Sequence, residues 1–171
     1  MEERKIETIQ EFDSLDAWYQ TVTDSIRIYT DGACSKNPGT GGFGAVLLTE
    51  NAKYEMNGGE PHTTNNRMEM RAAIEPLQQL VSYPVSCPII LWTDSLYLKN
   101  GVTLWIQKWK TNGWQTADKK EVKNQDLWQQ LDQLSSQFRL QWKWVRGHDG
   151  HYWNERADLL AGQGIVAQRM K

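Results

Sequence analysis

The sequence lacks the features that mark secreted or membrane-embedded proteins. It has only two cysteines, Cys34 and Cys87, whose spacing matches neither a metal site nor a disulfide framework, so we expect a reducing, cytoplasmic setting. No apolar run approaches the roughly 20 residues of a membrane span, and we expect no membrane partner. The acidic, polar start MEERKIETIQEFDSLD is not typical of a signal or transit peptide.

Net charge is also small, at −2, and by itself does not predict nucleic-acid binding. The distribution of charge is more informative. Between Trp105 and Asn124 the chain carries five lysines against Asp118 and Glu121, a local charge of +3, which leaves −5 for the remainder. A basic patch on an acidic body can bind a polyanion locally.

The 171 residues suggest one domain with a substantial core. Strand patterns occur at SIRIYT, FGAVLLTE, AKYEMNGGE, CPIILWT and FRLQWKWV, and short connections make the first three an antiparallel meander. Helical patterns cover residues 65–81, 95–101, 103–110, 125–137 and the C-terminal HYWNERADLLAGQGIVAQRM, and Thr64 or Asn65 is the expected cap of the first. We predict an α/β fold with a five-stranded mixed sheet flanked by helices, in which helix-linked strands are parallel.

Residues 1–24 differ from the rest of the chain, because they are acidic and show no strand pattern. Apolar side chains at helical spacing between Ser14 and Thr23 predict a short amphipathic helix. We favour an N-terminal extension whose helix docks on the flank of a domain formed by residues 25–171. A helix that binds a partner is the alternative.

Four carboxylates lie where such a fold can bring them together. Asp31 and Asp94 end predicted strands, and ligand crevices of α/β sheets form at the carboxyl ends of strands. Glu69 begins the helix between those strands, and Asp158 lies in the last helix. Hard cations such as Mg²⁺ prefer oxygen ligands, and a site for two of them must concentrate negative charge. The four acids therefore predict a site for divalent cations.

Each acid, and the nearby His148, also has a simpler local explanation. Asp31 precedes a glycine and fits a turn. Glu69 fits an acid favoured by the helix dipole, and Asp94 fits an N-cap. Asp158 fits a solvated surface acid. His148 lies in the glycine-flanked loop RGHDGH, where it suits proton transfer or product departure, with a loop histidine of no special task as the alternative.

Sequence runs spread over most of the chain resemble a known family: YTDGACSKNPGTGGFGA, TTNNRMEMRAAI, TDSLY, GWQTADKKEVKNQDLW and VRGHDGHYWNERAD. In this order and spacing the chain resembles a bacterial type 1 ribonuclease H from about Ile26 to Gln168. The resemblance implies a ribonuclease H-like fold and an endonuclease that cuts the RNA strand of RNA/DNA hybrids. It also implies two Mg²⁺ ions, with Mn²⁺ as an alternative, and products with 5′-phosphate and 3′-hydroxyl ends.

The resemblance assigns roles to particular residues. It makes Asp31, Glu69, Asp94 and Asp158 the metal-binding acids and His148 the histidine of the catalytic loop. The expected partner is an RNA/DNA hybrid, bound by a monomer. A relative that cuts DNA and a hybrid-binding protein that no longer cleaves are the rival functions. Retention of all four acids argues against the second, since a binder gains nothing from negative charges close to phosphates.

Hybrid recognition depends on the 2′-hydroxyl of RNA in a shallow minor groove. The resemblance favours contacts there by Asn37 and Asn65, and Asn66 is a further amide beside the metal acids. Turn and cap chemistry is the alternative for these asparagines. Thr64 matches a residue that holds a phosphate of the DNA strand. The lysine–tryptophan stretch resembles the basic protrusion that binds the DNA backbone. The expected contact residues there are Trp114, Lys119, Lys120 and Trp105, although Trp105 is expected to serve mainly in packing.

A few positions depart from the family pattern. Leu96 stands where a glutamine often touches RNA, and Asp149 stands where small residues are usual. Thr111, Asn112 and Gln115 make the protrusion less basic, so we expect weaker hybrid affinity and a shallower salt dependence. Pro76 lies inside a predicted helix and should kink it, since it removes one backbone donor.

Overall fold

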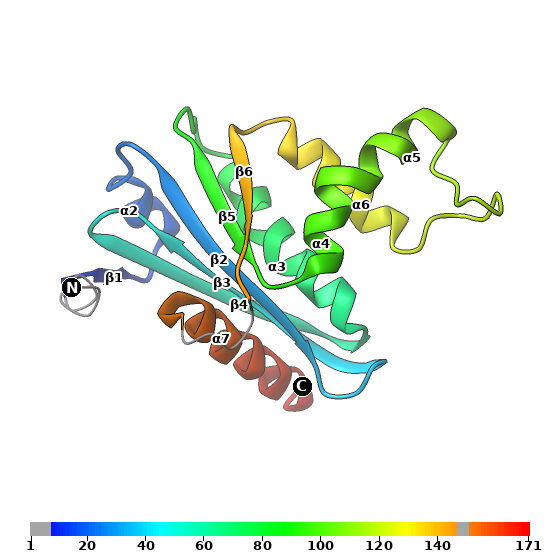
Figure 1. The fold of residues 1–171 in the computed structure, drawn as a ribbon. Helices are drawn as coiled ribbons and strands as arrows, with labels where there is room; N and C mark the ends of the chain where they lie inside the picture. Colours follow the sequence, from blue (N-terminus) through cyan, green and yellow to red (C-terminus); the bar gives the residue numbers. More distant parts are fainter. Residues whose placement is uncertain (1–7, 147–150) are drawn as a thin grey trace.

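A mixed β-sheet forms the centre of the computed structural model, which describes residues 8–146 and 151–171 (Figure 1). The strand order is β1-β4-β3-β2-β5-β6. The predicted meander is formed by β2 (Ile26–Cys34), β3 (Gly39–Leu48) and β4 (Ala52–Thr63), which pair antiparallel. On the other side of β2, the parallel strands β5 (Ile89–Thr93) and β6 (Leu140–Trp144) extend the sheet. The mixed α/β fold is therefore confirmed.

The strand count of five is wrong, because β1 (Gln10–Phe12) adds a sixth strand. This strand pairs parallel with β4, starting with Gln10 opposite Ala52. Three residues are too few to show the two-residue alternation by which strands are recognised in a sequence. Helix α2 (Leu15–Tyr19) follows, with Ser14 Oγ accepting the N–H of Ala17 at 3.4 Å, and its Trp18 is fully buried.

Two helices cover the two faces of the sheet (Figure 1). Helix α3 (Asn65–Leu80) packs its apolar side chains into the main core with β2 and β5, while α7 (Tyr152–Arg169) crosses the opposite face over β2, β3 and β4. The predicted cap of α3 is confirmed, since Thr64 Oγ1 accepts the N–H of Arg67 at 3.3 Å. The helix runs through Pro76 to its end at Leu80. In the described ranges, none of the helices combines the length and hydropathy that crossing a bilayer requires.

The remaining helices form a projection beside the sheet. Helix α4 (Leu96–Asn100), the π-helical turn η1 (Gly101–Trp105) and α5 (Ile106–Asn112) follow one another, and α6 (Gln125–Ser135) packs beside them. The loop between α5 and α6 extends away from the sheet (Figure 1). At its base, Trp105 and Trp109 pack against the fully buried Trp128, with ring centroids 6.3 and 5.7 Å from it. Their helical spacing predicts this packing.

Glycines let α7 approach the sheet closely. A Cβ at Gly44 of β3 would lie 2.6 Å from the carbonyl oxygen of Ala157, the residue before Asp158. Gly44 is paired directly with Asp31, so the two residues point to the same face of the sheet. The absence of a side chain at Gly44 therefore sets the distance between α7 and the strand that carries Asp31.

Replacing Gly44 with alanine is expected to lower the free energy of unfolding by about 1–3 kcal/mol, because the new methyl group forces α7 away from β3. Urea denaturation measures this loss. Gly162→Ala is the matched control on α7, since a Cβ there meets nothing within 4 Å, and it should be neutral or slightly stabilising. Equal stability of the Gly44 and Gly162 variants would contradict the close-packing argument.

Candidate active site

Asp31 lies within β2 and is 5% exposed. The next residue, Gly32, continues the strand opposite Phe43, and its N–H donates to Asp31 Oδ1 at 3.0 Å. The turn that an Asp–Gly pair can indicate is therefore absent here, and that alternative explanation is wrong. The carboxylate is instead held on the α7 side of the sheet, inside the protein.

Glu69 reaches the same place from α3 and is also 5% exposed. It lies beyond the first turn of the helix, which contains no acid, so the helix dipole does not account for it. A Cβ at Gly32 would lie 2.3 Å from the backbone nitrogen of Glu69. Glycine at this position thus allows α3 to press against β2 and carries the Glu69 carboxylate towards Asp31.

Asp94 directly follows β5, at the end of the sheet where β2 passes alongside. The N-cap role considered for it belongs to Ser95, whose Oγ accepts the N–H of Leu98 at 3.1 Å. The backbone at Asp94 is fixed from another side, because Trp144 Nε1 donates to its carbonyl oxygen at 3.0 Å. Its side chain can therefore serve the site rather than the helix.

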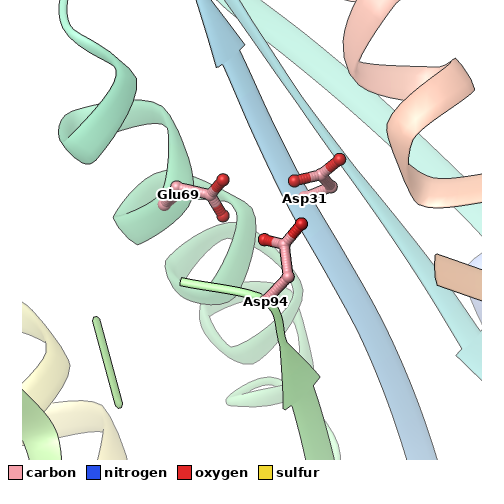
Figure 2. A group of neighbouring side chains, drawn as sticks. All are labelled: Asp31, Glu69 and Asp94. Atoms are coloured by element: carbon pink, nitrogen blue, oxygen red, sulfur yellow. The ribbon is translucent and has the colours of Figure 1, made fainter. Parts of the chain in front are cut away.

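The three carboxylates meet although they come from three different elements (Figure 2). One oxygen from each of Asp31, Glu69 and Asp94 lies within 4.8 Å of the others. Asp158, on the exposed side of α7, lies outside this group of three but is close enough to Asp31 to help raise the pKa of that carboxyl. The structure thus brings all four predicted acids to one end of the sheet, and three of them, Asp31, Glu69 and Asp94, lie close enough together to share a cation.

Crowded negative charge changes the proton affinities of the buried acids. Burial, then the Asp94 charge, then the hydrogen bond with Asp158 raise the pKa of Asp31 to about 8. Burial first, and the charges of Asp31 and Asp94 next, hold the pKa of Glu69 well above its usual range. Both shifts have the sign expected when carboxylates are desolvated together without a compensating cation.

This arrangement predicts that the metal-free protein loses folding stability as the pH rises. The ordinary pKa of Asp31 is 3.8 and its folded value is about 8, so the folded state keeps a proton that the unfolded chain releases between these values. Stability is full below pH 4 and falls as pH rises towards 8. Asp31→Asn is therefore expected to stabilise the metal-free protein by about 2–4 kcal/mol at pH 8, and by much less at pH 4.

Thermal unfolding in a chelator at several pH values measures this difference. Asp118→Asn, in the exposed loop between α5 and α6, is the control and should leave stability unchanged at every pH. If Asp31→Asn is no more stable than wild type at pH 8, burial and the neighbouring charges do not destabilise the ionised Asp31 carboxylate.

The donors present fit a hard divalent cation. Carboxylate oxygens alone suit Mg²⁺ or Mn²⁺ better than zinc or copper. Glu69 Oε2 is buried with no hydrogen-bond partner in the described part of the chain. Across the same ranges, neither Asp31 nor Glu69 forms an ion pair with a lysine or arginine. A cation bound between the carboxylates would supply the positive charge that these side chains lack.

The predicted substrate-contact residues lie on two sides of the acids. Asn37, Asn65 and Asn66 are exposed, and Asn37 Oδ1 accepts the backbone N–H of Asn65 at 3.1 Å, which ties the β2–β3 connection to the start of α3. Thr64 is occupied as the cap of α3. On the projection, Lys119 and Lys120 are exposed, whereas Trp114 and Trp105 are half-buried.

His148 and Asp149 lie outside the described residues. Leu96 is described, and its side chain is 51% exposed at the start of α4, two residues after Asp94.

Arg67, for which the sequence predicts no role, joins α3 to the start of α6. Its guanidinium donates to both Asp126 carboxylate oxygens, at 3.0 and 2.9 Å, and to Asn124 Oδ1 at 3.3 Å. Asn124 Nδ2 in turn donates to the hydroxyl of Tyr97 at 3.0 Å. Arg67 lies two residues before Glu69, and this position within the NNRME run is the only sequence signal that could have indicated its role.

Comparisons with known proteins agree with this geometry. The family model of RNase H matches residues 23–166. A ribonuclease H of Rhodopseudomonas palustris (strain TIE-1) is 56% identical over 144 residues, which cover 84% of this chain and 91% of the relative. A ribonuclease H of Thiobacillus denitrificans is 56% identical over 148 residues, covering 86% and 98% of the two chains.

Solved structures show the same fold. The crystal structure of LC9-RNase H1, described as a type 1 RNase H with the type 2 active-site motif, matches with a TM-score of 0.76 at 32% identity, over 86% of this chain and 74% of that one. Fold, acidic cluster and relatives together define a nuclease, a hydrolytic enzyme. The chain belongs to the ribonuclease H family.

Proposed function

We propose that this protein is an endonuclease that hydrolyses the RNA strand of RNA/DNA hybrids with two divalent cations, leaving 5′-phosphate and 3′-hydroxyl ends. The observation that carries the proposal is the convergence of Asp31, Glu69 and Asp94 within 4.8 Å, with Asp158 beside Asp31. A protein of the same fold, LC11-RNase H1, has been crystallised in complex with an RNA/DNA hybrid; at 22% identity and a TM-score of 0.64 it supports the fold alone.

Asp31 is central to this proposal because it faces both Asp158 and the pair formed by Glu69 and Asp94. It would bind both cations, Mg²⁺ in the first place and Mn²⁺ as the alternative, with the other acids completing the two sites. The chemistry that two bound cations supply is the activation of a water molecule and the stabilisation of the departing oxygen. The Gly32 N–H, which donates to Asp31 Oδ1 at 3.0 Å, helps to hold this carboxylate in place. His148 would exchange protons near the leaving group.

The hybrid would lie across the acids, between the asparagines and the projection. Exposed amides at Asn37, Asn65 and Asn66 can donate to and accept from the 2′-hydroxyls of the RNA minor groove. The N-terminus of α3 at Thr64, together with Lys119 and Lys120, would bind phosphates of the DNA strand.

Labelling each strand of the hybrid in turn tests the proposal. We expect fragments from the RNA strand only, and fragments that a ligase joins without prior phosphorylation, because their 5′ ends carry phosphate. Cleavage of the DNA strand, or 3′-phosphate ends, would contradict the proposed reaction.

The contribution of the projection to hybrid affinity is tested by the salt dependence of binding. Lys119→Gln/Lys120→Gln should weaken hybrid binding and lower the slope of log K against log salt by about 2, since each lost phosphate contact removes about one released counterion. Fluorescence anisotropy measures both effects in an Asp31→Asn background that does not cut. Arg169→Gln/Lys171→Gln, at the exposed end of α7, is the charge-matched control. An unchanged slope in the projection variant would remove these lysines from the interface.

A further inference from the structure

Helix α7 covers only part of its face of the sheet. It packs on β2, β3 and β4, and in Figure 1 no helix lies in front of β5 and β6 on this side. Register places two rows of side chains there, because directly paired residues point to the same face. Tyr29 is paired with Trp92 and Trp92 with Lys143, while the neighbouring row holds the residues Arg27, Ile90 and Gln141.

We call this surface the open face and define it by its accessible side chains. Lys143, Gln141 and Arg139 are exposed, and Trp92, Ile90 and Arg27 are half-buried. Arg139 belongs to it by strand alternation, two residues before Gln141. On the same face, the Tyr29 ring stacks on Trp92 at 5.4 Å and on His151, at the start of α7, at 5.0 Å.

The open face carries cations, of which Arg27 shares a pocket with the acids Asp24 and Glu50, while Lys143 lies over the Trp92 ring. Lys143 Nζ lies 5.1 Å from the centre of the Trp92 ring, much as Lys53 Nζ lies 5.9 Å from that of Trp153. Lys53 also pairs with Glu55 at 3.5 Å, whereas across residues 8–146 and 151–171 no ion pair involves Lys143, Arg27 or Arg139. An anion placed on this face therefore meets the charges of Lys143 and of Arg139, whose Nη1 also donates to the carbonyl oxygen of Ser86 at 3.3 Å.

The open face also lies next to the acid cluster. Asp31 follows Tyr29 by two positions on β2, and Asp94 follows Trp92 by two positions after β5, a distance of about 7 Å along each strand. From Arg139 to Lys143 the face extends about 13 Å further, enough for a few nucleotides. A strip with cations and an indole is typical of sites that bind single-stranded nucleic acid.

We propose that the open face binds a single-stranded tail of the RNA strand, continuing from the hybrid segment held at the acids. This inference rests on the proposed function and adds a substrate class to it: hybrids whose RNA extends beyond the DNA. Arg139, Lys143 and Arg27 contact the phosphates, and a base of the tail packs against the exposed part of Trp92.

Binding of blunt and tailed hybrids tests this inference. Hybrids with the same duplex and no tail, a 5′ RNA tail, a 3′ RNA tail or either DNA tail are compared by anisotropy with the full-length Asp31→Asn protein. We expect one RNA-tailed hybrid to bind at least about fivefold more tightly than the blunt one. Arg139→Gln/Lys143→Gln should remove this advantage, and Arg169→Gln/Lys171→Gln should preserve it. Lys143→Gln alone is a milder variant that should reduce the affinity ratio of tailed to blunt hybrid by at least about half. Thermal unfolding verifies that each variant is folded.

The outcomes separate this inference from the proposed function. Equal affinity for blunt and tailed hybrids overturns it, as does a preference for DNA tails alone. An equal loss of affinity for the blunt hybrid in Arg139→Gln/Lys143→Gln also overturns it, because the face would then contact the duplex. If the wild-type protein does not cut the blunt hybrid at all, the proposed function itself has failed, whatever the tails do.

Discussion

Asp31→Asn is expected to reduce cleavage of an RNA/DNA hybrid by at least about 10³-fold, which corresponds to about 4 kcal/mol of transition-state stabilisation. The substitution removes one negative charge from the centre of the acidic cluster and keeps the size of the side chain. The Gly32 N–H still finds an oxygen acceptor, so the strand should not move. Hybrid affinity should stay the same or increase, because one charge that repels phosphates is gone.

Single-turnover cleavage in Mg²⁺ and a separate binding isotherm measure the two effects. Asp132→Asn, on the surface of α6, is the control and should retain full activity, since it loses only an exposed ion pair with Lys110. If Asp31→Asn cuts within tenfold of wild type, the buried carboxylate is not part of the reaction. If it loses binding in proportion to cleavage, its role is in the fold.

Removal of divalent cations is expected to reduce cleavage at least as much as Asp31→Asn does, and return of Mg²⁺ should restore cleavage fully. Binding of cations should also raise the unfolding temperature, because they relieve the repulsion that raises the pKa values of Asp31 and Glu69. The gain should be larger at pH 8 than at pH 5, where these carboxyls hold protons that compete with the metal.

Thermal unfolding with and without Mg²⁺ measures this coupling. In Asp31→Asn/Glu69→Gln the temperature gain should disappear, while Gly162→Ala should keep it. Undiminished cleavage in excess chelator would contradict a metal-dependent site. A thermal gain that survives in the double variant would place the cation elsewhere.

Much of the fold could be predicted because its signals are local. Alternation marks β2 and β6, a uniformly apolar run marks β5, and the expected cap at Thr64 or Asn65 marks the start of α3, which Thr64 caps in the structure. The missed strand β1 had no such signal. Its three residues form a strand only because the edge of β4 is available to pair with them, which is a tertiary effect.

The acids illustrate what a sequence leaves open. Each had an ordinary local explanation, and for Asp31 and Asp94 only the structure could reject it, through the continuous strand at Gly32 and the cap at Ser95. Order along the chain indicated that these side chains share one end of the sheet. Their close approach depends on the space left by Gly32 and Gly44, which follows from helix–sheet packing and cannot be deduced from local patterns.

The central claim is tested most directly by incubating the purified protein with end-labelled RNA/DNA hybrid, duplex RNA and duplex DNA in Mg²⁺, beside Asp31→Asn. The account predicts that only the RNA of the hybrid is cut and that the variant cuts nothing. Tight binding of the hybrid without cleavage would instead make the protein a binding module. Cleavage of duplex DNA would contradict the proposed substrate class.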